Sequence, residues 1–134
     1  MEDIYVARLM STDLVTARPE TLVEDAARLL MDNDIGSLPI VAEDNELLGI
    51  LTTTDFVTIV AHSEPKAETT VERYTTTDVV TATAQEDIRD AADRMLANDC
   101  HHLPVVDDEA GLIGMISTAD LTQYLSRVET PSPA

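Results

Sequence analysis

The chain has 134 residues, 44% of them hydrophobic, with 26 acidic residues against 8 basic ones and a formal charge of -18. This length fits one ordinary domain or two small halves that fold unaided. The charge opposes binding to nucleic acid and to anionic membranes, because both require clustered Lys and Arg, so we expect neither as a partner.

The first half begins with a predicted strand at 14–17, LVTA, whose residues are largely β-branched or apolar. An amphipathic helix follows, because apolar residues recur at the i, i+3, i+4, i+7, i+8 spacing of one helix face. These residues are Val23, Ala26, Ala27, Leu30 and Met31. Thr21 and Glu24 have the spacing of a capping box, which predicts a helix start near Leu22. The helix should end around Asn33 and Asp34.

Two short strands and a helix complete the first half. We predict strands at 38–41 and 47–52, joined by a polar turn, and then a helix at about 53–61. The following segment, 63–72, contains proline and lacks apolar periodicity, and we interpret it as a linker.

The second half repeats the first. Residues 12–57 align with residues 77–122 without a gap, and 17 of the 46 positions are identical. The repeat predicts strands at 79–82, 103–106 and 112–117 and a final helix at about 118–127. Its first helix has the matching apolar face Ile88, Ala91, Ala92, Met95 and Leu96. The tail, 128–134, should be disordered.

The expected fold class is therefore α/β, more strictly α+β. We expect two βαββα repeats, at 8–62 and 73–127, that pack with pseudo-twofold symmetry into one module with a shared core. Neither half has enough helix to cover both faces of its own sheet.

Two pairs of motifs carry a family resemblance. The strands LPIV at Leu38 and LPVV at Leu103, followed by GILTTTDFV at Gly49 and GMISTADLT at Gly114, resemble those of a tandem pair of CBS domains, named after cystathionine beta-synthase. The resemblance covers almost the whole chain. It implies a regulatory module that binds an adenosyl ligand such as AMP, ATP or S-adenosylmethionine in clefts between the repeats. It also implies pairing into a homodimer and no obligatory cofactor.

The repeated Ser/Thr-x-x-Asp pattern has two interpretations. Thr52 with Asp55, and Ser117 with Asp120, have the spacing of a capping box that starts each final helix. Alternatively, the same helix start is a ligand site, because free N–H groups and the positive end of the helix dipole attract anions. The resemblance assigns the aspartates to ribose hydroxyls, for which a carboxylate offers two acceptors.

The residues before the strand proline differ between the repeats. The second repeat has His101 and His102, which the resemblance makes candidates for contacts with ligand phosphates, with ligand-free turn histidines as the alternative. The first repeat has Gly36 and Ser37, which offer no positive charge, so its cleft is expected to be weak, empty or suited to an uncharged adenosyl group. The remaining candidate ligand-binding residues are Thr16, Thr81, Pro39 and Pro104; the two threonines have β-propensity as their alternative explanation.

No metal site is expected. Cys100, His101 and His102 are consecutive, lack the spacing of known zinc sites and have no matching second pair. Cys100, the single cysteine, is interpreted as a structural thiol.

Nothing in the sequence builds a catalytic constellation, so we do not expect an enzyme. The leading hypothesis is an adenosyl sensor that passes its ligand state to a separate, unknown effector protein. The alternative is a ligand-free scaffold for dimerisation or interaction. A dimer interface is expected on the final helices, through the apolar residues Phe56, Val57, Ile59, Val60, Leu121, Tyr124 and Leu125.

The absence of a long apolar run and of a signal-peptide pattern in the first ten residues predicts a soluble, cytoplasmic protein. Lys66 is the only lysine, and acidic residues surround the apolar positions. This composition suggests a halophilic surface, since high salt shortens the Debye length and weakens self-repulsion.

Overall fold

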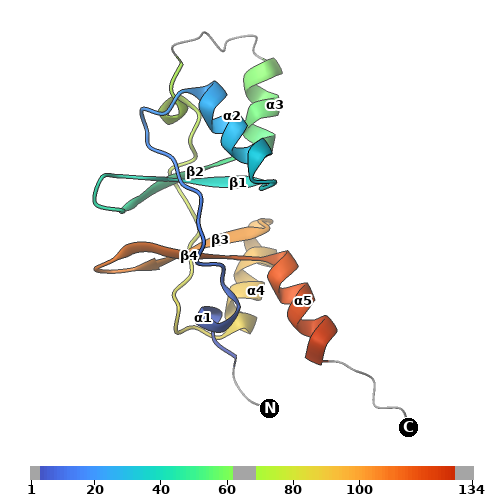
Figure 1. Cartoon of the computed structure of the whole chain (residues 1–134). Helices are drawn as coiled ribbons and strands as arrows, with labels where there is room; N and C mark the ends of the chain where they lie inside the picture. Colours follow the sequence, from blue (N-terminus) through green and yellow to red (C-terminus); the bar gives the residue numbers. More distant parts are fainter. Residues whose placement is uncertain (1–3, 62–68, 129–134) are drawn as a thin grey trace. The chain divides into compact units, whose positions relative to one another are not determined.

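A computed structural model describes residues 4–61 and 69–128, and the chain forms two compact units (Figure 1). The first-repeat unit is Val15–Val79 together with Ala110–Leu112. The second-repeat unit is Met1–Leu14, Val80–Glu109 and Ile113–Ala134. Each unit therefore combines segments that are distant in the sequence. The fold is α+β, with helices beside small two-stranded sheets.

The first-repeat unit contains one two-stranded antiparallel sheet. Its elements are α2 (Val23–Asp32), β1 (Ser37–Val41), β2 (Leu47–Thr52), α3 (Thr53–Ala61) and the short 3-10 helix η1 (Val71–Arg73). In the register of the sheet, Leu38 lies opposite Leu51, and an irregularity falls between Ile40 and Val41. α2 packs on β1 and α3 packs on β2.

The second-repeat unit follows the same plan. Its elements are α1 (Val6–Leu9), α4 (Ile88–Asn98), β3 (His102–Asp107), α5 (Thr118–Val128) and, from Ile113 on, β4 (Gly111–Ser117). β3 and β4 form the second sheet. α4 packs on β3, and α5 contacts both α1 and α4.

The segment leading into each repeat pairs with the second strand of the other repeat. Ser11 exchanges two backbone hydrogen bonds with Met115 of β4, at 2.8 and 3.0 Å, and Thr76 exchanges two with Ile50 of β2, at 2.9 and 3.0 Å. This pairing explains why the two units are discontinuous in sequence.

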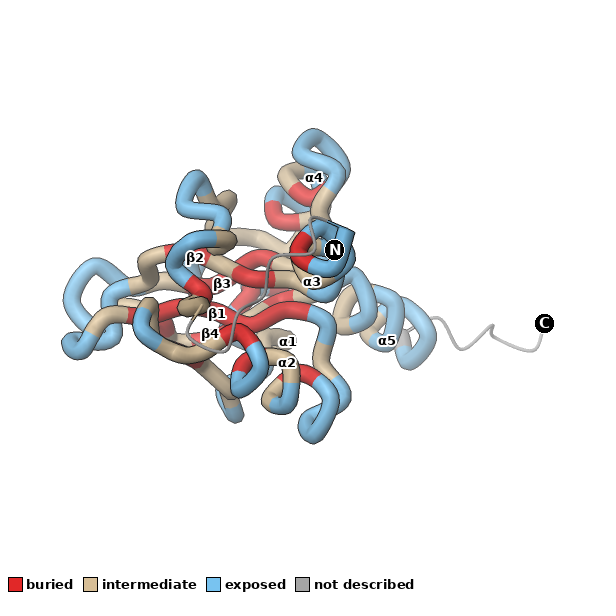
Figure 2. Tube along the Cα trace, turned by 90° about the horizontal axis from the view of Figure 1, so that it is seen from above, coloured by how far each residue is buried: buried red, intermediate tan, exposed pale blue. Residues whose placement is uncertain are grey.

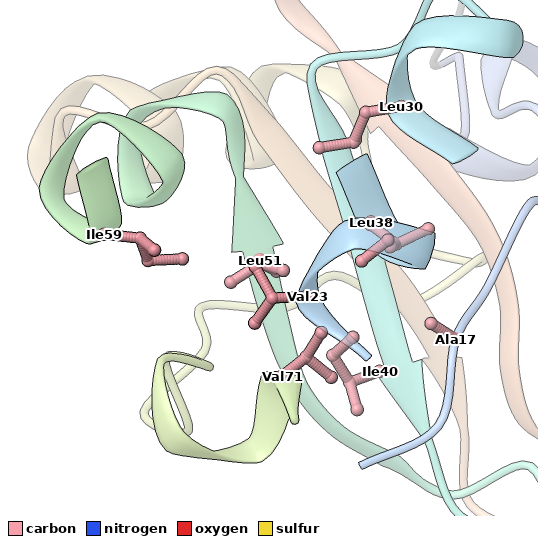
Figure 3. Packing of buried hydrophobic residues seen from close by; sticks show 9 residues of the cluster. Ala17, Val23, Leu30, Leu38, Ile40, Leu51, Ile59 and Val71 are labelled. Atoms are coloured by element: carbon pink, nitrogen blue, oxygen red, sulfur yellow. The ribbon is translucent and has the colours of Figure 1, made fainter. Parts of the chain in front are cut away.

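Each unit has its own cluster of buried hydrophobic residues. Figure 2 marks the buried parts of the chain in red. In the first-repeat unit the cluster joins α2, both strands, α3 and η1 (Figure 3), through Ala17, Val23, Ala26, Leu30, Leu38, Ile40, Leu51, Ile59 and Val71. The second-repeat cluster consists of Val6, Ala82, Ala84, Ala91, Met95, Leu103, Val105 and Ile116. Ile59 was predicted to be part of a dimer surface, and this prediction is wrong, because its side chain lies in the core at 1% exposure.

Several local predictions are corrected. The expected strands at 14–17 and 79–82 are each reduced to a single bridging residue: Ala17 bridges Ile40 and Ala82 bridges Val105. The capping box at Thr21 is wrong, because Leu22 is the N-cap of α2, so Thr21 lies one residue too early to cap the helix. Thr21 Oγ1 instead accepts a hydrogen bond from the Arg18 backbone at 3.0 Å.

Most of the predicted linker, and the predicted tail from residue 129, lie outside the described residues. The described end of the linker is ordered, since Thr70 bridges Leu22 and leads into η1. Among the residues that are described, no helix has the length and apolar character to cross a membrane.

Candidate functional site

Thr52 and Asp55 lie at the start of α3. Asp55 Oδ2 accepts hydrogen bonds from the Thr52 backbone N–H at 2.8 Å and from Thr52 Oγ1 at 3.1 Å. Thr52 directly precedes the helix and Asp55 is its third residue, so the carboxylate reaches back as in a capping box. Both side chains are partly exposed.

Ser117 and Asp120 repeat this geometry at the start of α5. Asp120 Oδ2 accepts from the Ser117 backbone N–H at 2.9 Å and from Ser117 Oγ at 3.1 Å. Here Ser117 Oγ also accepts from the Asp120 backbone N–H at 3.2 Å, which completes the reciprocal pair. The capping interpretation of the motif is therefore confirmed at this helix.

Capping leaves part of each aspartate available. In every hydrogen bond that the described residues donate to the carboxylate of Asp55 or Asp120, the acceptor is Oδ2. Oδ1 of each partly exposed carboxylate is thus available to a donor such as a ligand hydroxyl. The capping and ligand-binding interpretations are therefore compatible.

The residue two positions before each strand leucine lies against the start of the final helix of the same repeat. The backbone N–H of Thr53 donates to the Gly36 carbonyl at 3.1 Å, and that of Thr118 donates to the His101 carbonyl at 3.0 Å. In the second repeat the structure therefore brings the histidine pair together with Ser117 and Asp120. In the first repeat, the corresponding neighbours of Thr52 and Asp55 are Gly36 and Ser37.

His102 carries less positive charge than a phosphate-binding role would favour. Its half-buried position lowers the pKa of the imidazole, and the neighbouring His101 lowers that pKa further, whereas Asp120 raises it. With the pKa below its ordinary value of 6.5, the imidazole is neutral at pH 7 in the ligand-free chain. His101 is exposed.

The two candidate threonines precede the bridging residues of their repeats. Thr16 and Thr81 are both partly buried. The next residue, Ala17 or Ala82, donates its backbone N–H to the carbonyl of the strand proline, at 3.0 Å to Pro39 and 2.9 Å to Pro104. Each threonine is thus held beside the first strand of its own repeat's sheet.

The prolines themselves are buried within the strands. Their carbonyls already accept the backbone hydrogen bonds from Ala17 and Ala82. Because both ring and carbonyl are engaged within the chain, the observed positions of Pro39 and Pro104 favour a packing role.

Sequence reasoning missed an ion pair beside Thr81. Arg94, on α4, donates to both carboxylate oxygens of Glu86 at 2.7 Å and also to the Thr81 carbonyl at 2.8 Å. The hydrogen bond from Arg94 is the main reason why the pKa of Glu86 lies below its ordinary value, although burial opposes the shift. The sequence signal was a mismatch in the repeat, since Arg94 aligns with Leu29 and Glu86 with Thr21.

Burial raises the pKa of Cys100, and the negative charge of Asp99 adds to this shift, so the sulfur is a thiol at neutral pH. Within the described part of the chain, no group of three or more His, Cys, Asp or Glu side chains is placed to hold a metal ion.

The chain matches the model of the CBS domain twice, at residues 6–62 and 71–127. It belongs to the CBS domain family. The structure is similar to that of the CBS domain pair of protein MJ0100 in complex with 5'-methylthioadenosine and S-adenosyl-L-methionine. That similarity has a TM-score of 0.87 and 27% identity, and it covers 96% of this chain and 100% of the other.

Other proteins are similar over most of this chain. An uncharacterized conserved protein from Pyrococcus horikoshii has the same fold, with a TM-score of 0.81, 24% identity and complete coverage of both chains. An uncharacterized 17.7 kDa protein of Acidianus ambivalens is 32% identical over 93% of this chain and 75% of its own length. A homoserine O-acetyltransferase of Methanosalsum zhilinae is 33% identical over 93% of this chain, which spans only 25% of that enzyme.

Proposed function

We propose that this CBS domain pair is a regulatory module that binds an adenosyl ligand and passes its ligand state to a separate effector protein. The observation that carries the proposal is the aspartate at the start of each final helix, which keeps Oδ1 available while Oδ2 caps the helix. A ribose presents two neighbouring hydroxyl donors, which suits such a carboxylate. The adenosyl complexes of the similar MJ0100 domain pair support this ligand class.

Among adenosyl ligands, the charges favour those without phosphate groups. Gly36 and Ser37 contribute no cation to the first repeat, and burial keeps His102 neutral in the second. Anionic aspartates at both helix starts would oppose a phosphate, whereas they would tolerate a neutral thioether or attract a sulfonium cation. We therefore place 5'-methylthioadenosine and S-adenosylmethionine before AMP and ATP as ligands.

Regulation requires that the ligand bind two arrangements of the module with different affinity. We propose that the chain acts as a homodimer without catalytic activity of its own. Val57 and Val60 on α3 and Leu125 on α5 are each more than half exposed and support a protein interface there. The same exposure favours the second candidate function, a ligand-free interaction scaffold. Sedimentation showing only a 14.6 kDa species would exclude the homodimer.

Calorimetric titration in concentrated KCl tests the proposal, with 5'-methylthioadenosine, S-adenosylmethionine, AMP and ATP as ligands. Two variants separate capping from binding. Asp120→Ala removes both roles and should lower the free energy of unfolding by about 0.5 to 2 kcal/mol. Asp120→Asn keeps an oxygen that can accept from Ser117 but replaces the second acceptor by a donor.

We expect Asp120→Asn to stay close to the wild type in stability and to lose at least tenfold in affinity at the second repeat. Asp55→Asn is the matched change in the first repeat. Full affinity in both asparagine variants would show that the motif only caps helices. Absence of saturable binding to the wild type by all four compounds would favour the scaffold.

A further inference from the structure

Arg94 links three parts of the second-repeat unit. Its guanidinium donates to both oxygens of Glu86 at 2.7 Å, and the same Nη1 donates to the Thr81 carbonyl at 2.8 Å. Both side chains are substantially buried, with 34% of Arg94 and 16% of Glu86 exposed. Two parallel hydrogen bonds to one carboxylate fix the orientation of a guanidinium, whereas a single hydrogen bond lets it rotate.

Glu86 is itself fixed to the turn. Its Oε1 accepts a hydrogen bond from the Thr83 backbone N–H at 2.9 Å. Two backbone groups near Thr81 are therefore fixed. Arg94 holds the Thr81 carbonyl, and Glu86 holds the Thr83 amide. Between Thr81 and Thr83, Ala82 donates its N–H to the Pro104 carbonyl at 2.9 Å and accepts from the Val106 N–H at 3.0 Å. Little freedom remains for the Thr81 backbone.

The first repeat lacks this arrangement. Leu29 occupies the position of Arg94 and packs against the hydrophobic cluster, so it offers no donor to the Thr16 carbonyl. Thr21 occupies the position of Glu86. Its hydroxyl accepts the Arg18 backbone N–H at 3.0 Å, which matches the bond from the Thr83 N–H to Glu86 in the second repeat. The turn is thus conserved between the repeats, while the link to the threonine carbonyl exists only in the second.

We propose that Arg94 is a positioning residue that fixes Thr81 for ligand contact and gives the second repeat the higher ligand affinity of the two. This inference rests on the proposed function and on the sequence-based prediction that Thr81 contacts the same adenosyl ligand as Asp120. A threonine whose backbone is already ordered loses less conformational freedom on binding. Thr16 lacks this link and is held only through the backbone bonds of Ala17 with Pro39 and Val41, so it has more conformational freedom to lose on binding.

Titration of S-adenosylmethionine and 5'-methylthioadenosine into Asp55→Ala protein isolates the second repeat. In that background we compare Arg94→Leu with the double variant E86T/R94L, which gives this turn the two residues that the first repeat uses. The double variant therefore retains a hydroxyl acceptor for the Thr83 N–H while lacking the link to Thr81. Arg28→Leu is the matched control, because Arg28 is exposed on α2 and its ion pairs with described residues are those with Glu24 and Asp25.

Arg94→Leu and E86T/R94L should both weaken binding by roughly threefold to tenfold, whereas Arg28→Leu should leave affinity unchanged. E86T/R94L should keep this loss of affinity even if its unfolding midpoint returns from that of Arg94→Leu to that of the Asp55→Ala background. Wild-type affinity in E86T/R94L would overturn the proposal, since Arg94 would then serve only the stability of the turn. Unchanged affinity in Arg94→Leu would also overturn it. If Asp55→Ala protein and the wild type bind neither of these compounds, nor AMP or ATP, the proposed function fails as well. This outcome is distinct from binding that is insensitive to Arg94.

Discussion

Replacing Gly49 by alanine tests why the repeated motif begins with glycine. Gly49 lies in β2, where the segment around Thr75 and Thr76 passes directly over it. A Cβ atom at Gly49 would lie 2.5 Å from the Thr76 carbonyl oxygen and closer still to the Thr75 side chain. Gly36 is the control, because a Cβ there meets nothing within 4 Å.

The magnitude follows from the distances. Ordinary van der Waals contact begins at 3.4 Å, so the Thr76 backbone would have to move by 3.4 minus 2.5, which is 0.9 Å. That backbone makes two hydrogen bonds with Ile50, at 2.9 and 3.0 Å, and a shift of this size would break or strongly weaken both. Two bonds at about 1 kcal/mol each and an overpacking cost of about 1 to 3 kcal/mol together predict a loss of about 3 to 5 kcal/mol.

Thermal unfolding followed by circular dichroism measures the effect. The loss corresponds to a decrease of roughly 9 to 20 °C in the unfolding midpoint for a chain of this size. Gly36→Ala should stay within about 0.5 kcal/mol of the wild type. The reasoning is refuted if Gly49→Ala unfolds within 2 °C of the wild type, as a rough threshold set by that scale, or if both alanine variants lose the same stability.

Two further predictions concern His102 and Asn45. Because the pKa of His102 is lowered in the folded chain, the unfolded chain binds a proton more readily, so stability should fall as the pH drops below 6.5. In urea titrations, His102→Gln should reduce the decline between about pH 7 and pH 5, and an unchanged slope would contradict this assignment. Asn45 has φ 71° and donates its amide to the carbonyls of Ala110 and Leu112 at 2.9 and 2.7 Å. Both Asn45→Gly and Asn45→Ala lose these bonds, but only alanine has a steric penalty in the left-handed backbone conformation. The Asn45→Ala variant should therefore be less stable than Asn45→Gly by about 1 kcal/mol. Equal free energies of unfolding for the two variants would refute this explanation.

Much of the candidate site could be predicted, because its residues are close in sequence. Ser117 and Asp120 are three positions apart, and a helix start places such a pair together without help from the rest of the chain. The neutral state of His102 could not be predicted, since it depends on the burial of the side chain, which residues adjacent in sequence do not determine. Arg94 was missed for a related reason: a guanidinium on a helix is usually solvated, and its link to Thr81 spans 13 positions.

The sequence by itself determined the repeat, the family and the regular elements. β2 and α3 have the bounds that periodicity predicted, because alternating and helical patterns act within a few residues. Only the tertiary structure decided which unit each leading segment joins. Thr76 pairs with β2, and Ser11 pairs with β4 more than a hundred residues away in the chain. Backbone pairing of this kind leaves no periodic pattern of side chains in the sequence. The glycines of the two motifs indicate only that another segment of the chain approaches the strand closely, without identifying that segment.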